Sequence, residues 1–195
     1  MGMGLKKINN KILYFLIGIG TIAVHFLHIL TDLIELAYGF SNFQLILTYI
    51  AFLFIPFVIL GLYAVQWPKG GWLGLIGSIL YIISFIYFSG TALYAIDSMQ
   101  NGNSNYEIIY NELGTLYIFN GGLMVIGGIM FGLSVIRAKI FPYITGILLI
   151  VGLLINALVA FLPINPMFQI IGSIVRNIGL MGMGIAIVYK SNRVF

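Results

Sequence analysis

Four ionisable side chains recur at short intervals in the first apolar stretch of the chain: His25, His28, Asp32 and Glu35. Their spacings of three, four and three residues place them within a sector of about 80° on one face of a helix. Imidazoles and carboxylates in such a stripe could line a water-filled path, bind a cation or pass protons. The alternative is that the acids lie at the wet end of the helix, while the histidines bond to neighbouring helices.

Arg176 is a second ionisable residue inside an apolar stretch. At a helical rise of ~1.5 Å per residue it lies about 13 Å from the nearer end, where an unpaired arginine costs at least about 2.5–3.5 kcal/mol. We therefore expect it to pair with an acid, first Asp32 and then Glu35 or Asp97. The amides of Asn120 and Asn156 fall at a similar depth. Single amides in membrane helices more often only join helices, but their shared depth predicts one polar pocket.

A metal site is another use of the stripe. His25, His28 and Asp32 could give zinc the three protein ligands of a hydrolase, although the sequence has no third histidine and no HExxH motif. Haem held by one histidine is a weaker alternative. A nucleophilic serine beside a histidine also stays open, without motif support. The serines that could supply it are Ser78, Ser84 and Ser89.

These side chains belong to a chain of 195 residues, of which 61% are hydrophobic and 7% are charged. Soluble domains have about 25% charged residues, so the composition excludes a water-soluble globule, and it also excludes a disordered chain. With no cysteine, disulfides, iron–sulfur clusters and thiolate zinc sites are excluded. The net charge of +4 comes from loop lysines and arginines, so it does not indicate nucleic-acid binding.

Six stretches have the length of about 20 apolar residues that a membrane span needs. They cover residues 12–36, 43–66, 72–96, 113–136, 140–162 and 167–189. Each must be a helix, because unpaired backbone groups are not tolerated in lipid. The sequence therefore predicts an all-α polytopic membrane protein, a six-transmembrane-helix bundle in a single domain over residues 1–195. The first span is read as uncleaved, since no small-residue cleavage site follows it.

Basic residues near the span ends predict the orientation of the bundle. If the spans alternate, eight of the nine basic residues fall on one side, and the ninth is Arg176. The eight are Lys6, Lys7, Lys11, Lys69, Arg137, Lys139, Lys190 and Arg193. The five acids fall on the other side: Asp32, Glu35, Asp97, Glu107 and Glu112. Both termini are therefore expected in the cytoplasm.

Turn and packing signals refine this picture. Short links at residues 67–72 and 163–166 favour antiparallel neighbours. A capping box at residues 104–107 predicts that the fourth helix begins before its span. Pro56 should kink the second helix. The glycine spacings 70–74 and 128–132 allow close helix approach, and we interpret them as packing within the chain rather than between copies.

The layout resembles that of the small six-helix membrane proteins common in bacteria. Several of these carry a histidine and then an acid near the end of the first span, as His28 and Asp32 do here. The resemblance covers the whole layout without a specific motif, and it implies no activity. The bias towards Ile, Lys, Asn and Tyr suggests a low-GC bacterial genome, and hence residence in the plasma membrane.

Two main hypotheses of function follow. The first is a multi-pass protein with an outward-open polar pocket that binds or conducts a proton, a cation or a small polar molecule. The second is an accessory, sensory or protective protein that acts through partners in the bilayer. A membrane-embedded metal-dependent hydrolase is a third hypothesis. Because it ranks below the other two, an enzymatic function is not favoured. A homo-oligomer or a membrane-protein partner stays open, and the sequence indicates no particular cofactor. The residues expected to line the pocket are His25, His28, Asp32, Glu35, Asn120, Asn156 and Arg176.

Overall fold

The structure is a computed structural model, and it describes residues 2–101, 106–162, 165 and 167–193. Within these residues the chain forms six α-helices, and each is long and apolar enough to cross a membrane. The helices are α1 (Gly2–Tyr38), α2 (Asn42–Gln66), α3 (Gly71–Gln100), α4 (Tyr106–Ala138), α5 (Tyr143–Phe161) and α6 (Met167–Arg193). The all-α fold class and the six apolar helices expected from the sequence are confirmed.

Local backbone chemistry explains where the helices differ from the expected boundaries. Helix α5 begins three residues later than expected, because Pro142 precedes it as the N-cap and Lys139 has a positive φ of 54°. Helix α4 begins before its span, as expected, and it breaks at Gly114, where φ is 46° and ψ is −127°. Glycine adopts positive φ without the steric cost that a Cβ atom brings. The first part of the predicted capping box, residues 104–105, lies outside the described residues.

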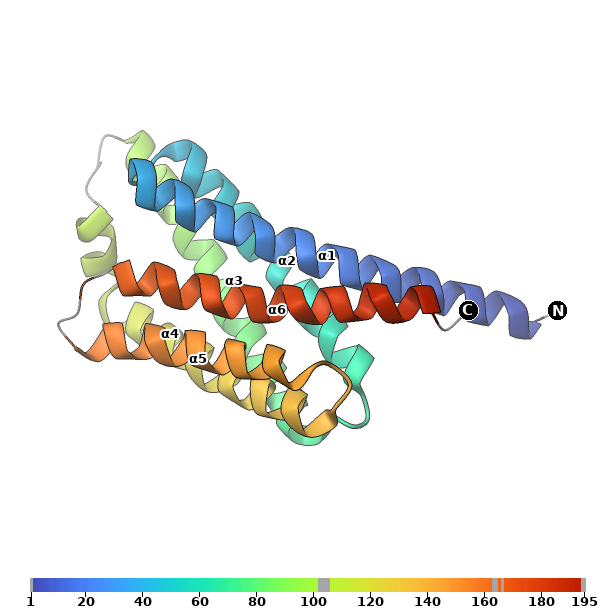
Figure 1. Ribbon diagram of the computed structural model, residues 1–195. Helices are drawn as coiled ribbons and strands as arrows, with labels where there is room; N and C mark the ends of the chain where they lie inside the picture. Colours follow the sequence, from blue (N-terminus) through green and yellow to red (C-terminus); the bar gives the residue numbers. More distant parts are fainter. Residues whose placement is uncertain (1, 102–105, 163–164, 166, 194–195) are drawn as a thin grey trace.

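Pro56 lies inside α2 and does not end it. We expected this proline to kink the helix; α2 continues through it to Gln66, and the bend at Pro56 stays a prediction. Helix α4 has non-helical backbone at Gly114, and its first turns stand apart from the rest of that helix (Figure 1).

The contacts between helices follow the order of the chain, and the last helix contacts the first. Each helix packs against the next one, and α6 returns to pack against α1. The links are short, such as residues 67–70 between α2 and α3, so successive helices are antiparallel. The six helices form a closed ring with both termini at one end (Figure 1). We call this the termini end and the opposite one the far end.

Close helix packing in the ring depends on glycine. A Cβ atom at Gly77 of α3 would lie 2.5 Å from the backbone nitrogen of Phe131 on α4, and Gly132 of α4 faces Gly146 of α5 in the same way. Gly128 packs against Leu153. The interpretation of the 128–132 glycine spacing as packing within the chain is therefore confirmed.

The interior of the ring is mainly apolar towards the termini end. Fully buried side chains from α2, α4, α5 and α6 meet there, and the outer surface is also apolar. The central members of this core are Ile55, Ile59, Leu62, Phe131, Val135, Leu149, Leu153, Leu180 and Met183. A buried polar pair also lies near that end, where Gln66 Nε2 donates to Ser134 Oγ at 3.0 Å. The ionisable buried side chains gather in the half of the ring near the far end.

Candidate functional site

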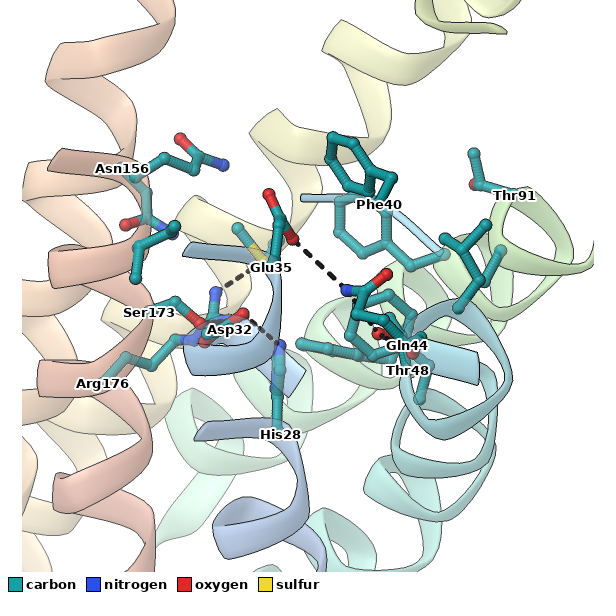
Figure 2. Close-up of a pocket in the computed structure, with 18 of the residues that line it drawn as sticks. His28, Asp32, Glu35, Phe40, Gln44, Thr48, Thr91, Asn156, Ser173 and Arg176 are labelled. Atoms are coloured by element: carbon teal, nitrogen blue, oxygen red, sulfur yellow. Dashed lines mark hydrogen bonds and ion pairs between the residues drawn. The ribbon is translucent and has the colours of Figure 1, made fainter. Parts of the chain in front are cut away.

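A cavity of about 130 Å³ lies inside the ring near its far end, and all six helices line it (Figure 2). Its polar lining comes from the second halves of α1, α3 and α5 and from the first halves of α2 and α6. The polar lining residues are His28, Asp32, Glu35, Gln44, Thr48, Thr91, Asn156, Gln169, Ser173 and Arg176. Antiparallel alternation explains this placement, since those helix halves share one end of the bundle.

Five of the seven residues expected from the sequence line this cavity. They are His28, Asp32, Glu35, Asn156 and Arg176. His25 and Asn120 are buried at a similar depth, but they do not line it.

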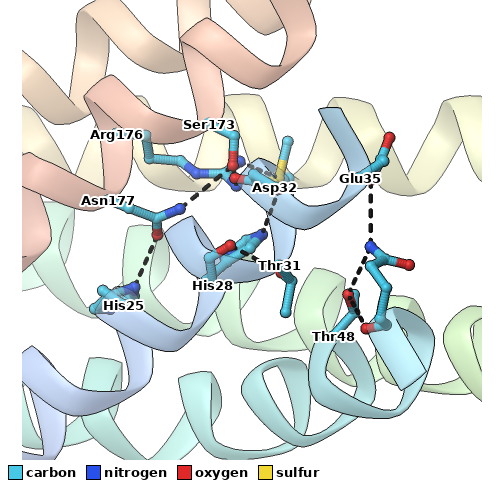
Figure 3. Close-up of polar contacts among 11 residues, drawn as sticks. His25, His28, Thr31, Asp32, Glu35, Thr48, Ser173, Arg176 and Asn177 are labelled. Carbon is cyan, nitrogen blue, oxygen red and sulfur yellow. Dashed lines mark hydrogen bonds and ion pairs between the residues drawn. The ribbon is translucent and has the colours of Figure 1, made fainter. Parts of the chain in front are cut away.

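His25 and Asn120 join neighbouring helices instead. A hydrogen bond of 2.9 Å connects His25 Nδ1 to Asn177 Oδ1 on α6 (Figure 3). Asn120 Nδ2 donates to the backbone carbonyl of Ser84 on α3 at 3.1 Å. Both bonds agree with the alternative interpretation, in which polar side chains hold neighbouring membrane helices together.

Arg176 is 3% exposed and has two described hydrogen bonds. Its Nη2 donates to Ser173 Oγ at 3.2 Å, and its Nη1 donates to Met124 Sδ at 3.1 Å. The guanidinium carbon also lies 5.7 Å from the centre of the Phe85 ring, within the range of a cation–π contact. A thioether is a weak acceptor, so the cation remains only partly satisfied by these neighbours.

We expected a direct ion pair between Arg176 and an acid of α1, and this detail is wrong for the described residues. The ion pair of Asp32 there is a long one, 3.9 Å from its Oδ1 to His28 Nε2. Arg176 and Asp32 nevertheless line the same cavity and act on one another electrostatically. Ser173, one helical turn before Arg176, takes the guanidinium hydrogen bond on the side that faces Asp32 (Figure 3).

A second polar group crosses from α1 to α2. Gln44 Nε2 donates to Glu35 Oε2 at 3.4 Å and to Thr48 Oγ1 at 3.1 Å. Gln44 is 2% exposed. Glu35 is therefore held by a neutral amide, whereas Asp32 lies near the guanidinium of Arg176.

Aromatic rings lie beside the polar lining, towards the middle of the ring. The imidazole of His28 packs edge-on against Phe52, with 5.0 Å between ring centres, and Phe52 packs against Phe85 at 5.4 Å. Phe88 adjoins both phenylalanines. The cavity thus has an apolar floor of aromatic rings, and the apolar core lies between this floor and the termini end.

Five buried polar atoms of the lining have no hydrogen-bond partner within the described part of the chain. They are His28 Nδ1, Asp32 Oδ2, Gln44 Oε1, Asn156 Oδ1 and Arg176 Nε. Buried polar groups are almost always hydrogen-bonded, because leaving one unpaired costs about 1–3 kcal/mol. Their gathering around one cavity gives it the capacity to bind a polar molecule.

The metal hypothesis gains no geometric support. Among the described residues, no three His, Cys, Asp or Glu side chains come together in a way that could hold a metal ion. His25 bonds to Asn177 and does not line the cavity with His28 and Asp32. The zinc site and the membrane-embedded hydrolase therefore stay untested predictions.

The serines considered as nucleophiles donate to carbonyls of their own helix. Their acceptors are the carbonyl oxygens of Leu75, Tyr81 and Ile86, for Ser78, Ser84 and Ser89 respectively. Such back-bonding is the usual state of a serine inside a helix.

Sequence reasoning missed five polar lining residues: Gln44, Thr48, Thr91, Gln169 and Ser173. Gln44 and Thr48 are four residues apart near the start of an apolar stretch. That spacing places them on one helix face, at the depth of Glu35. This signal could have identified them, whereas nothing in the sequence around Thr91 distinguishes it from a residue facing lipid.

No protein-family model, curated protein or solved structure matches this chain.

Proposed function

We propose that the protein is an integral membrane protein whose pocket near the far end of the bundle binds a small polar molecule or ion. The observation that carries this proposal is the group of five unpartnered buried polar atoms around one cavity. In lipid, such atoms have no access to water from the bilayer, so a bound solute stabilises them more than it would at a wet surface.

The proposal includes an orientation, with both termini in the cytoplasm and the pocket open to the outside. The basic residues support it, because Lys11, Lys69, Arg137 and Lys190 are at the termini end while Asp97 is at the far end. Basic residues favour the cytoplasmic side. The bacterial plasma membrane is the proposed location, from the composition and the layout.

Binding is favoured over conduction. The polar lining stops at the rings of Phe52 and Phe85, and the buried side chains of Ile55, Ile59 and Leu62 follow on α2. An ion that crossed this core would lose its polar partners, at a cost of several kcal/mol. A pocket that is closed towards the cytoplasm suits a receptor or a carrier intermediate better than a channel.

Thermal unfolding of the purified protein in detergent tests the proposal against a panel of alkali and divalent cations, ammonium salts, small carboxylates and polyols. A bound solute raises the unfolding temperature, because saturation at 100 times Kd stabilises by about 2.7 kcal/mol. Asn156→Leu should abolish the rise, whereas the matched variant Asn120→Leu, outside the cavity, should keep it.

A flat response to the whole panel, equal in the wild type and in Asn156→Leu, would contradict the binding role. It would favour the accessory protein that acts through partners.

A further inference from the structure

We infer that the pocket selects a small primary ammonium ion, a monocation that carries its N–H donors on a single nitrogen. This inference rests on the proposed binding role, and it deepens that role by naming the ligand class. It is carried by the charge of the lining, by the kinds of atom left unpartnered, and by the size and floor of the cavity.

The charge of the lining favours a monocation. With both carboxylates ionised and His28 neutral, Asp32 and Glu35 contribute two negative charges and Arg176 one positive charge. Arg176 acts on Asp32, while the described hydrogen bond of Glu35 comes from the neutral amide of Gln44. When Glu35 is ionised, one negative charge is therefore left over near it. Unbalanced charge is costly in a low-dielectric interior, and one bound monocation neutralises it.

The unpartnered atoms favour a ligand that donates. Asp32 Oδ2, Gln44 Oε1 and Asn156 Oδ1 are acceptors on three different helices, whereas Arg176 Nε is a donor. His28 Nδ1 serves in either role, according to its tautomer. An ammonium group has three donors and no acceptor, so it matches this excess of acceptors. A carboxylate ligand would satisfy the guanidinium, but it would face Asp32 and Glu35.

The cavity volume limits the ligand to a short one. About 130 Å³ corresponds to roughly four water molecules at about 30 Å³ each, which fits an amine with three or four carbons. The rings of Phe52, Phe85 and Phe88 adjoin the polar lining. They offer the alkyl chain an apolar surface, and they attract a cation through their π-faces.

Isothermal titration of the full-length protein in detergent tests the inference with four probes of similar size. The probes are propylammonium, 1-propanol, propionate and tetramethylammonium, at matched chloride concentration. Propylammonium should bind most tightly. The alcohol lacks the charge, propionate has the opposite charge, and tetramethylammonium has the charge but no N–H donor.

Two variants locate the selectivity. Glu35→Gln keeps the shape of the side chain and removes its charge, so it should weaken propylammonium binding by at least about tenfold. Asp97→Asn is the matched control, because Asp97 is an acid at the same end that contacts Asn101 outside the cavity. Its affinity should equal that of the wild type. If Glu35→Gln does not fold, Gln44→Met carries the test, since it removes the acceptor Gln44 Oε1.

The outcomes separate the two proposals. Equal or tighter binding of propanol, propionate or tetramethylammonium would overturn the ammonium inference and leave the binding role intact. Binding of propylammonium that neither variant weakens would also overturn it. If no probe binds and the broader solute panel also gives a flat thermal response, both proposals fail together.

Discussion

A Cβ atom added to Gly152 of α5 would come within 2.5 Å of the backbone nitrogen of Arg176 on α6. The two helices touch through their backbones at this point, and Gly172 faces Gly152 in the same contact. The close approach of α5 and α6 at Arg176 therefore depends on a glycine of the neighbouring helix. The position of Arg176 in the pocket thus depends on Gly152, which has no side chain.

This contact predicts that Gly152→Ala destabilises the protein. The added methyl group meets backbone atoms that cannot move aside, and overpacking of this kind costs about 1–3 kcal/mol. The unfolding midpoint in detergent should fall accordingly. Gly122→Ala is the matched control, because a Cβ atom at Gly122 has open space around it. Equal stability of the two alanine variants would contradict the backbone contact between α5 and α6.

Replacing Arg176 should destabilise the fold through Asp32. Arg176→Leu removes a charged hydrogen bond to Ser173, worth about 1.5–3 kcal/mol, and a contact with the weak acceptor Met124 Sδ. It also leaves Asp32 without a nearby cation. Adding Asp32→Asn removes that charge, so the double variant should be more stable than Arg176→Leu alone. Unfolding midpoints of the single and double variants measure the coupling. Strictly additive losses would show that the two residues are independent.

The two histidines should behave differently when each is changed to alanine. His25→Ala breaks the bond to Asn177 and should cost about 0.6–1.7 kcal/mol of stability, the range for such contacts in membranes, while solute binding persists. His28→Ala changes the lining itself and should weaken binding. Thermal shifts with and without solute separate the two effects. Loss of binding in His25→Ala would place that histidine in the site after all.

Much of the fold could be predicted from sequence, because length and apolarity alone identify a membrane helix. The exceptions have local causes. Pro142 delays the start of α5, and Gly114 breaks α4 with a positive φ. Neither effect changes the hydropathy of the stretch, so hydropathy could not predict it.

The site could be predicted only in part. The shared helix face of the α1 residues is a property of spacing, and it placed His28, Asp32 and Glu35 together correctly. A face about 80° wide can still meet two different neighbours, and His25 turns to α6 rather than to the cavity. Ser173 was missed because its role depends on the closure of α6 against α1, which no local pattern encodes.

The proposed orientation can be tested with single cysteines, because the chain has none of its own. Tyr38 at the far end is 85% exposed, and Trp72 at the termini end is 76% exposed. In intact bacterial cells, Tyr38→Cys should react with a membrane-impermeant maleimide. Trp72→Cys should react only after the cells are permeabilised. The reverse pattern would place both termini outside.

Access of solutes to the pocket from outside the cell is the central claim, and thiol labelling at Thr91 tests it most directly. Thr91 lines the cavity, and its hydroxyl bonds only to its own helix among the described contacts. Thr91→Cys in intact cells should react with an impermeant cationic thiosulfonate, and propylammonium should slow the reaction. Thr21→Cys, fully buried away from the cavity, should stay unlabelled. A Thr91→Cys protein that reacts no faster than Thr21→Cys, with or without propylammonium, would contradict an outward-open binding pocket.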